Sequence, residues 1–350
     1  MSQANALALQ EAGTSKLDDY YQALKGENLG PLWVSLKGLV PSEPRPKALA
    51  HVWSYASVRP RLLEAGGLIT AEEAERRVLV LENPGLPGAS QITDTIYAGL
   101  QLILPGEIAP AHRHSQSALR FVIEGTGAYT AVDGERTTMH PGDFIITPAW
   151  TWHDHGSAAD GPVVWMDGLD VPLVRFLGTG FREEHRDAAQ EIERAEGTTD
   201  AMFGQGLLPL GATARHTSPV FNYPYARTRD ALGRLARAED PDSHVGHALR
   251  YVNPTNGDWA IPTIATSMRL LPAGFTTRPY RSTDGAVLVL VEGALKARIG
   301  SKDFFLAPKD VAALPAWTDF TLEATEESVF FMYSDRPVHE KLGLWREHKG

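Results

Sequence analysis

The amino-acid sequence predicts an all-β protein with a helical segment at its N-terminal end. Three observations support this class. From about residue 90 to 175 the chain consists of short apolar and β-branched runs separated by glycine- and proline-containing turns, which is typical of a sandwich or barrel. Segments from this region recur near the C-terminal end, which indicates a duplicated β module. Residues 1 to 80 instead show mostly helical spacing.

The composition excludes several function classes. The 350 residues contain no cysteine, so disulfides, thiolate metal sites and cysteine nucleophiles are excluded, and any metal must be bound by nitrogen and oxygen. The net charge is −10 without a basic cluster, so we expect neither nucleic acid nor a membrane as partner. No apolar run is long enough to span a bilayer and no secretory signal is evident, so we expect a cytoplasmic protein.

The N-terminal part contains two segments that predict helices. The segment LDDYYQALKGEN, residues 17–28, places apolar residues at helical spacing. In ITAEEAERRVLVLENPG, residues 69–85, Thr70 is a plausible N-cap before two glutamates, and VLVLE then reads as a strand. Further along, residues 132–135 (VDGE) predict a hairpin turn. The charged residues 181–198 predict a helical linker.

Two pairs of segments define the internal repeat. LPGEIAPAHRHSQSALRFVIEG (104–125) resembles LPAGFTTRPYRSTDGAVLVLVEG (271–293), and PGDFIITPAWTWHDH (141–155) resembles PKDVAALPAWTDFTL (308–322). Both pairs begin 167 residues apart (271 − 104 and 308 − 141). We therefore expect four parts: a mostly helical segment 1–80, a first module 81–180, a helical linker with loops 181–250, and a second module 251–350.

The histidines of the first copy are absent from the second. When the two copies are aligned, Pro279/Tyr280 correspond to His112 and Arg281/Ser282 correspond to His114. Phe320 corresponds to His153. Histidines that only packed the module would be expected to recur in both copies. The difference favours a functional role for the first set.

His112, His114 and His153 form a candidate metal site. Residues i and i+2 of a strand share one face, so His112 and His114 present two imidazoles side by side, and His153 on a later strand supplies a third. Three neutral imidazoles suit iron, copper, nickel, manganese or zinc, and the donor set does not choose among them. The competing interpretation is that they are ordinary surface or core histidines. His155 alternates with His153, and we expect it to act as an acid or base rather than as a fourth ligand.

These segments resemble one known family. GEIAPAHRHSQSAL matches the opening of the cupin motif, with Ala118 in place of its usual glutamate, and PGDFIITPAWTWH matches the second cupin motif. Together with ERRVLVLENPG, YAGLQLILPGE and WMDGLD, the chain resembles the gentisate 1,2-dioxygenase and salicylate 1,2-dioxygenase family of ring-cleaving enzymes. The resemblance is strong over residues 30 to 175 and weaker elsewhere.

The resemblance implies a bicupin fold with two double-stranded β-helix (jelly-roll) modules. It also implies Fe(II) at His112, His114 and His153, a second module without metal, a small aromatic hydroxy acid and O2 as substrates, and usually a homotetramer. A site without a carboxylate ligand retains the full charge of the metal. We interpret Ala118 as an adaptation to a dianionic, chelating substrate.

Further residues are candidates for substrate binding. Arg120 lies six residues after His114, and in a regular strand this even spacing would place it on the metal face, where it could pair with a carboxylate. Arg76 matches a family position that contacts the substrate carboxylate, and Arg77 is a second choice. The resemblance further implies that Gln101 lies near the substrate hydroxyl and that Tyr97 and Gly99 lie beside the ring. Asp167 is a candidate to orient His155 or another imidazole.

The predicted reaction is the extradiol-type cleavage of the C1–C2 ring bond of gentisate (2,5-dihydroxybenzoate), with insertion of both oxygen atoms of O2. The alternative is a salicylate, 5-substituted-salicylate or 1-hydroxy-2-naphthoate 1,2-dioxygenase, which Gly99 favours. An alternative of another class is a non-catalytic bicupin that stores or binds ligands, which would consume no oxygen.

Overall fold

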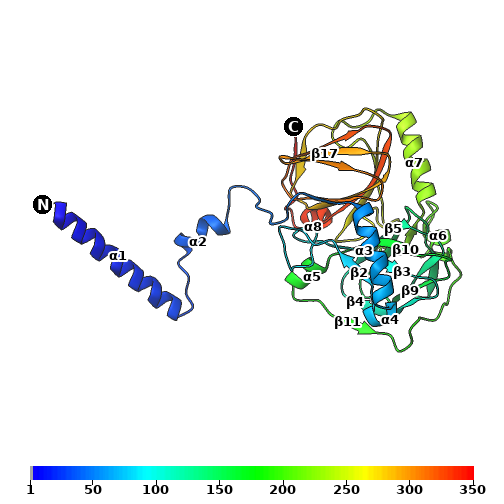
Figure 1. Cartoon of the computed structure of the whole chain (residues 1–350), viewed down its shortest axis with the longest axis horizontal. Coiled ribbons are helices and arrows are strands. Elements are labelled where there is room, and N and C mark those ends of the chain that lie inside the picture. The colour runs from blue at the N-terminus through cyan, green and yellow to red at the C-terminus, as the bar shows by residue number, and fades with distance from the viewer. Residues whose placement is uncertain (1–2) are drawn as a thin grey trace. The chain divides into compact units, whose positions relative to one another are not determined.

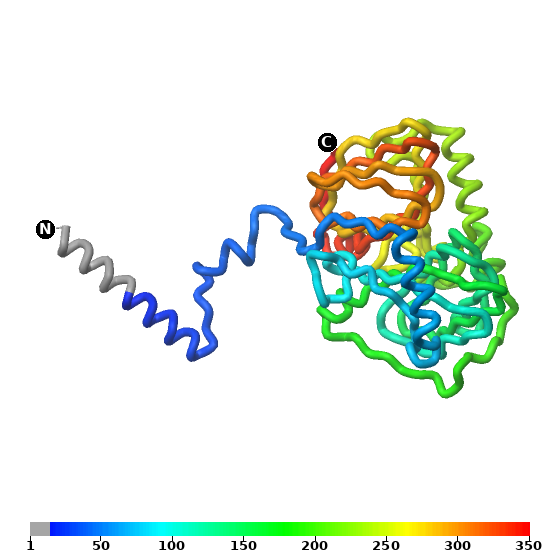
Figure 2. Tube along the Cα trace, viewed as in Figure 1, coloured from blue at the N-terminus to red at the C-terminus, as the bar shows by residue number. Residues whose placement is uncertain are grey.

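The computed structural model describes residues 3–350, with side chains from residue 15 onward (Figures 1 and 2). The chain divides into two compact units, residues 1–45 and residues 46–350. The first contains α1 (Gln3–Gly26) and α2 (Leu32–Leu39), and the Trp33 indole donates a hydrogen bond of 3.0 Å to the Tyr21 hydroxyl. Among the described helices, none has both the length and the apolar character that a bilayer crossing requires.

Residues 46–350 form two β modules, each made of a six-stranded and a five-stranded antiparallel sheet. The sheets of the first module have the orders β12-β8-β5-β10-β3-β2 and β11-β4-β9-β6-β7. Their bounds are β2 (Val78–Val80), β3 (Tyr97–Ile103), β4 (Ile108–His114), β5 (Ala118–Glu124), β6 (Ala128–Val132), β7 (Glu135–Thr138), β8 (Phe144–Thr147), β9 (His153–Ser157), β10 (Val163–Leu169), β11 (Arg182–Glu184) and β12 (Asn222–Tyr223).

The second module repeats this arrangement with the orders β1-β19-β16-β21-β14-β13 and β18-β17-β20-β15-β22. Its strands are β1 (His51–Trp53), β13 (His247–Arg250), β14 (Ala265–Leu271), β15 (Tyr280–Ser282), β16 (Ala286–Glu292), β17 (Leu295–Ile299), β18 (Lys302–Leu306), β19 (Val311–Leu314), β20 (Phe320–Ala324), β21 (Ser328–Ser334) and β22 (Glu347–Lys349). The predicted duplicated β fold is therefore confirmed.

Helices cover the edges and ends of these sheets. They are α3 (Tyr55–Leu68), α4 (Ala71–Ala74), α5 (Val171–Phe176), α6 (Thr198–Phe203), α7 (Tyr225–Ala238) and α8 (Arg336–Lys341). Helix α3 lies against β3, and α7 lies beside β13 and β14 of the second module (Figure 1).

Two edge strands come from outside the predicted bounds of the module that they extend. β1 precedes the first module in the sequence but pairs with β19 of the second, and β12 follows the first module but pairs with its β8. Strand pairing therefore crosses the predicted boundaries at residues 80 and 180. The four-part division of the chain stays a prediction.

The six-stranded sheets share one apolar core. Phe121 of β5 stacks on Phe331 of β21 with ring centres 4.4 Å apart, and Phe144 of β8 packs on the same ring. A second apolar cluster fills the interior of the second module and includes Tyr280 and Phe320. Burial of aromatic and aliphatic area at the shared core favours a fixed arrangement of the two modules.

A reciprocal pair of aspartates links the modules. Asp170, before α5, accepts hydrogen bonds from the Ser117 backbone N–H (2.9 Å) and from the Thr263 hydroxyl of the other module (2.6 Å). Asp335, before α8, accepts equivalent bonds from the Gly285 N–H (2.9 Å) and the Thr95 hydroxyl (2.7 Å). The repeat thus extends to individual hydrogen bonds.

Several local predictions are confirmed. Residues 17–26 lie in α1, and Thr70 caps α4 by accepting a bond of 3.1 Å from the Glu73 N–H. The predicted hairpin turn joins β6 to β7, and Asp133 and Gly134 both have positive φ (46° and 79°), as a type I′ turn requires.

The predicted helix over residues 181–198 is wrong. This segment begins with β11, which extends the five-stranded sheet by pairing Arg182 with His114 and Glu184 with His112. The Ala111 N–H then donates to the Ala188 carbonyl at 2.9 Å. The open edge of β4 offers backbone partners along its length, and this long-range pairing outweighs the local helical propensity of a charged segment.

Candidate functional site

Three histidines meet between β4 and β9 of the first module. His112 and His153 are directly paired across the two strands, and His114 follows two residues after His112 on the same face. Their ring centres lie 4.4 to 5.3 Å apart. One nitrogen of each ring lies within 4.8 Å of the others, and this is the one group of metal-ligating side chains found among the described residues.

The hydrogen bonds of these rings suit metal binding through Nε2. Nδ1 of His114 lies 2.9 Å from the Gln116 carbonyl oxygen, and Nδ1 of His153 lies 3.0 Å from the Thr151 carbonyl oxygen. A ring whose Nδ1–H donates to a carbonyl presents a lone pair at Nε2. Nε2 of His153 is buried and finds no hydrogen-bond partner among the described residues, which is costly unless a ligand such as a metal ion satisfies it.

The environment keeps the three imidazoles neutral. Burial, followed by the charge of Arg76, lowers the pKa of His112 to about 2. Burial also lowers the pKa of His114 to about 4 and that of His153 well below its usual range. Neutral imidazole is the form that binds a divalent metal, so these residues fit the predicted role.

The donor set of this cluster contains no carboxylate. Ala118, where the cupin motif usually has glutamate, is buried on β5 between Thr147 and Leu169. A bound divalent ion would therefore retain its full double charge. Such a centre favours anionic ligands at its open positions.

The six-stranded sheet presents a row of the predicted residues on one face. In antiparallel pairing, Gly99 lies opposite Asp167, and Asp167 lies opposite Arg120. Directly opposed residues share a face, so these three positions form a continuous line across β3, β10 and β5. Tyr97 and Gln101 lie on the same face of β3 because they are two residues before and after Gly99.

Arg120 is the buried cation of this row. Its Nε lies 3.5 Å from Asp167 Oδ1, and its Nη1 donates to the Thr147 hydroxyl. After burial, the charge of Arg120 is the largest cause that lowers the pKa of His153. The spacing argument for its orientation was wrong, because His114 and Arg120 belong to different strands, β4 and β5.

The two neighbouring arginines of ERR have different surroundings. Arg76 Nη2 lies 2.8 Å from His112 Nδ1 and donates to the Pro110 carbonyl at 2.9 Å. Burial, followed by the charge of Arg120, lowers the pKa of Arg76 to about 9. Arg77 instead pairs with Glu107, so the structure places Arg76, and not Arg77, at the histidines.

His155 lies behind the cluster and is fully buried. Its Nδ1 lies 2.9 Å from the Thr130 hydroxyl, and no described residue forms a hydrogen bond with its Nε2. The ring centres of His153 and His155 are 6.0 Å apart, and His155 is not part of the metal-ligating group.

Asp167 does not orient an imidazole as the sequence suggested. It accepts a hydrogen bond of 3.0 Å from the Trp165 indole and faces Arg120. Burial raises the pKa of Asp167 to about 6, against the opposing effect of Arg120. Its position two residues after Trp165 on β10 explains this partner, because the two side chains share one face.

Sequence reasoning missed two polar residues of the site. Thr130 holds His155, and Thr147 contacts Arg120. Both are completely buried. The sequence feature that could have identified them is a threonine within an otherwise apolar strand. This feature is clearest for Thr147, at the end of FIIT.

Comparisons with known proteins agree with this geometry. Residues 99–171 match the family described as Cupin domain. The chain is 49% identical to gentisate 1,2 dioxygenase 1 of Aquipseudomonas alcaligenes, over 97% of this chain and 98% of that protein. It is 38% identical to the gentisate 1,2-dioxygenase of a Streptomyces species, over 95% and 96% of the two chains.

A solved structure gives the same result. The salicylate 1,2-dioxygenase of Pseudoaminobacter salicylatoxidans, determined as adducts with gentisate, superposes with a TM-score of 0.91 at 33% identity, covering 95% of this chain and 94% of that one. These relatives are more than 30% identical to the chain over nearly its whole length. The structure contains two β modules, and the first of them holds the three-histidine cluster. The chain therefore belongs to the gentisate and salicylate 1,2-dioxygenase family of ring-cleaving bicupin dioxygenases.

Proposed function

We propose that this protein binds Fe(II) at His112, His114 and His153 and cleaves gentisate between the ring carbons that carry the carboxylate and the adjacent hydroxyl. Both atoms of O2 enter the product, maleylpyruvate. The relatives named above support this substrate. The observation that carries the proposal is a cluster of three neutral imidazoles with two arginines beside it.

The charge balance of the site favours an anionic substrate. Arg76 and Arg120 contribute two positive charges, and Asp167 is the one carboxylate that faces Arg120 within 4.0 Å among the described residues. Two cations against one anion leave an excess of one positive charge, before any metal is counted. A substrate with a carboxylate and an ionised phenol would offset this excess in a buried site, where charge pairing matters most.

The ion would be held through the Nε2 atoms of the three histidines. Fe(II) in such a neutral nitrogen set supplies open positions for a chelating substrate and for O2, together with redox chemistry. The protein contributes rings in fixed orientations. In His114 and His153 the Nδ1 atoms lie 2.9 and 3.0 Å from backbone carbonyl oxygens. Preorganised ligands of this kind need little rearrangement on binding.

Substrate orientation falls to the arginines and the β3 residues. We infer that Arg120 and Arg76 bind the carboxylate, and that Tyr97, Gly99 and Gln101 flank the ring. Fixing the ring relative to the metal lowers the entropic part of the barrier. His155, whose Nε2 has no partner, accepts or shares the proton of the substrate hydroxyl, while Thr130 fixes its other nitrogen.

Oxygen uptake tests the proposed reaction. The purified chain is loaded anaerobically with Fe(II), and air is then admitted with gentisate, salicylate, 5-aminosalicylate or 1-hydroxy-2-naphthoate. We expect gentisate to give the highest kcat/KM, one O2 consumed per ring cleaved, and new near-ultraviolet absorbance of the ring-opened product. Absence of uptake with all four acids in iron-loaded protein would overturn the proposal.

His153→Ala tests the metal site directly. Loss of one of three ligands should reduce bound iron to well below one ion per chain and lower turnover by a factor on the order of 10³ or more. Iron content measured by elemental analysis gives a readout that is independent of activity. His216→Ala, at an exposed position, is the matched control and should bind iron as the unaltered chain does.

Salicylates are the second candidate substrates, and Gly99 is the observation that favours them. A Cβ at this position would lie 2.9 Å from the Tyr97 hydroxyl and 2.4 Å from Val78 Cγ1, so a larger residue would displace both neighbours. Glycine at this position therefore fixes where the Tyr97 hydroxyl lies, and we infer that this placement of Tyr97 admits a ring without a second hydroxyl. If kcat/KM for salicylate exceeds that for gentisate in the assay above, this candidate replaces the first.

We also infer that the protein acts as a homotetramer. The support is the apolar surface of the first unit, where Trp33 is 65% exposed and Leu36 and Leu39 are exposed beside it. Apolar groups clustered on a surface commonly mark protein interfaces. The cytoplasmic location stays a prediction.

A further inference from the structure

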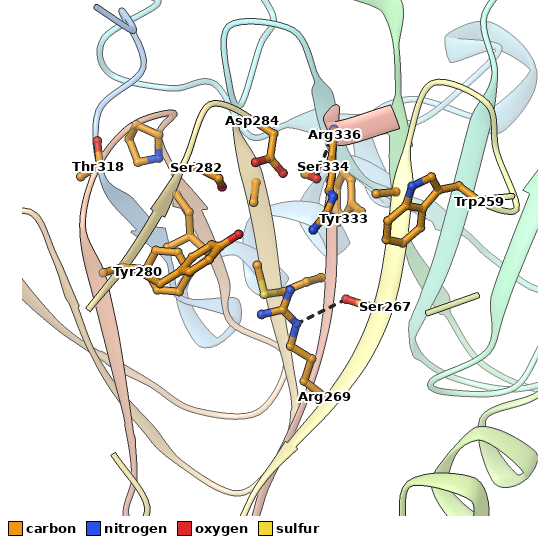
Figure 3. A pocket seen from close by; sticks show the side chains of 16 residues that line it. Trp259, Ser267, Arg269, Tyr280, Ser282, Asp284, Thr318, Tyr333, Ser334 and Arg336 are labelled. Carbon is orange, nitrogen blue, oxygen red and sulfur yellow. Dashed lines mark hydrogen bonds between the residues drawn. The ribbon is translucent and has the colours of Figure 1, made fainter. Parts of the chain in front are cut away.

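The second module contains a polar pocket at the place that corresponds to the three-histidine cluster of the first (Figure 3). The strand register establishes this correspondence. His112 pairs with His153 between β4 and β9, and Tyr280 pairs with Phe320 between β15 and β20. Tyr280 and Phe320 line the pocket, so they occupy the positions of two ligands of the first module.

The third position is equally well defined. The backbone N–H of Trp150 donates to the His114 carbonyl at 2.7 Å, and the N–H of Trp317 donates to the Ser282 carbonyl at 2.6 Å. Both tryptophans have positive φ, 59° and 54°. Ser282 therefore replaces His114. The second module has lost all three nitrogen ligands, yet it has kept an open interior at this point.

A guanidinium provides positive charge in this pocket instead. Gln101 is the fifth residue of β3, and Arg269 is the fifth residue of β14, the equivalent strand. Arg269 lines the pocket, and its single hydrogen bond among the described residues joins Nε to Ser267 Oγ at a long 3.4 Å. No carboxylate of the described residues lies within ion-pair distance of it, although the charge of Asp284 acts on it, and burial lowers its pKa. A half-buried cation without a close ion-pair partner gains from an anion that joins it.

A second guanidinium faces the same space. Arg336 begins α8 and points into the pocket toward Arg269 (Figure 3). Its Nε pairs with Glu340 at 2.7 Å, and its guanidinium carbon lies 3.9 Å from the centre of the Trp345 ring, which holds the side chain in place. The Nη1 and Nη2 atoms of Arg269 and of Arg336 form no hydrogen bond with a described residue, so they can donate to a ligand between the two side chains. Two planar guanidinium groups around one cavity are suited to a carboxylate, which can accept from both.

The remaining polar groups and the volume restrict the ligand further. Asp284 lines the pocket, and within the described part of the chain its buried Oδ1 has no hydrogen-bond partner, so it requires a donor such as a hydroxyl. The space that the centres of water-sized molecules can occupy is about 50 Å³. This corresponds to roughly four water molecules, which is enough for a short aliphatic acid.

We propose that the second module is a metal-independent binding site for a small aliphatic hydroxycarboxylate, whose carboxylate lies between Arg269 and Arg336 and whose hydroxyl donates to Asp284. The duplicated barrel has thus exchanged a metal ion for guanidinium groups and retained anion binding. This role is separate from ring cleavage, because the pocket lies inside the second module and shares no residue with the histidine cluster.

Isothermal titration of the full-length protein with glycolate tests the proposal. We expect saturable binding of one glycolate per chain, and acetate, which lacks the hydroxyl, to bind at least several-fold more weakly. Arg269→Gln restores the residue type of the first module and should raise the Kd for glycolate at least tenfold. Arg298→Gln is the matched control, because this arginine lies on the exposed β17–β18 hairpin and pairs with Asp303. Its Kd should not change.

Two further variants make the outcome decisive. A 2-hydroxy acid can also chelate iron, so His153→Ala should bind glycolate with unchanged Kd if the site is in the second module. If Arg269→Gln does not fold, Arg336→Gln, at a partly exposed side chain, replaces it and should also weaken binding at least tenfold. Unchanged affinity in the arginine variants, or loss of binding in His153→Ala, overturns the proposal whatever the oxygen-uptake assay shows.

Discussion

Arg120 shows how a single buried charge is accommodated. Its guanidinium is balanced by Asp167 at 3.5 Å and by the Thr147 hydroxyl, and burial lowers its pKa. The ion pair is therefore loose, and in the part of the chain that the structure describes Nε of Arg120 has no hydrogen-bond partner. A buried arginine with spare donors is prepared to accept a substrate carboxylate.

Arg120→Lys tests this role at the residue scale. Lysine keeps the charge but cannot form two parallel bonds, so we expect KM for gentisate to rise about tenfold, which corresponds to about 1.4 kcal/mol, with a smaller effect on kcat. Bound iron should stay near one per chain. Arg227→Lys, on the surface and paired with Asp200, is the control. A normal KM in Arg120→Lys would show that the carboxylate binds elsewhere.

At the scale of elements, short helices start where the two modules meet. Asp170 and Asp335 each precede a helix whose second residue is proline, and each accepts a hydrogen bond from a backbone N–H of its own module and one from a threonine hydroxyl of the other. This pairing joins the ends of β10 and β21 to loops of the opposite module. Buried carboxylates in such positions make stability depend on pH.

Asp170→Asn tests that dependence. Burial raises the pKa of Asp170 from 3.8 to about 6. Between about pH 4 and 6 the folded chain retains a proton that the unfolded chain has released, so this residue makes stability fall as pH rises through the window. The asparagine variant should lose this slope and should be more stable than the unaltered chain at pH 7, by on the order of 2 kcal/mol.

Thermal unfolding midpoints measured from pH 4 to pH 8 give the readout. Asp160→Asn, at an exposed position, is the control and should follow the unaltered chain at every pH. If Asp170→Asn shows the same pH slope as the unaltered chain, the carboxyl is already ionised at low pH and the interpretation of its burial is wrong.

At the scale of the whole molecule, one duplicated architecture carries two different interiors. The first module encloses the three histidines with Arg76 and Arg120, whereas the second has a pocket lined by Arg269 and Arg336 next to an apolar cluster, in which Leu288 takes the position equivalent to Arg120. The shared core around Phe121 and Phe331 joins them. Duplication therefore preserved the strand framework and allowed the interior residues to diverge.

The proposed homotetramer is tested at this scale by a double substitution in α2. Leu36→Ser with Leu39→Ser removes exposed apolar area, so we expect the mass measured by light scattering to fall from four chains to one or two. Lys37→Ser on the same helix is the control and should remain tetrameric. A tetramer that persists in the double variant would place the interface elsewhere.

The sequence by itself determined the β modules, their repetition and the identity of the three histidines. These features depend on local alternation, turn residues and spacing, which are properties of neighbouring residues. The Asp133–Gly134 turn is an example, because its backbone conformation follows from the residue types.

Only the tertiary structure decided which polar groups meet. Arg76 and Arg77 are adjacent in sequence, yet one contacts His112 and the other Glu107. Likewise, residues 181–198 became an edge strand and loop because the free edge of β4 was available. The physical reason is that pairing across sheets joins residues far apart in sequence, and its free energy outweighs local propensity wherever a buried charge or an open strand edge must be satisfied.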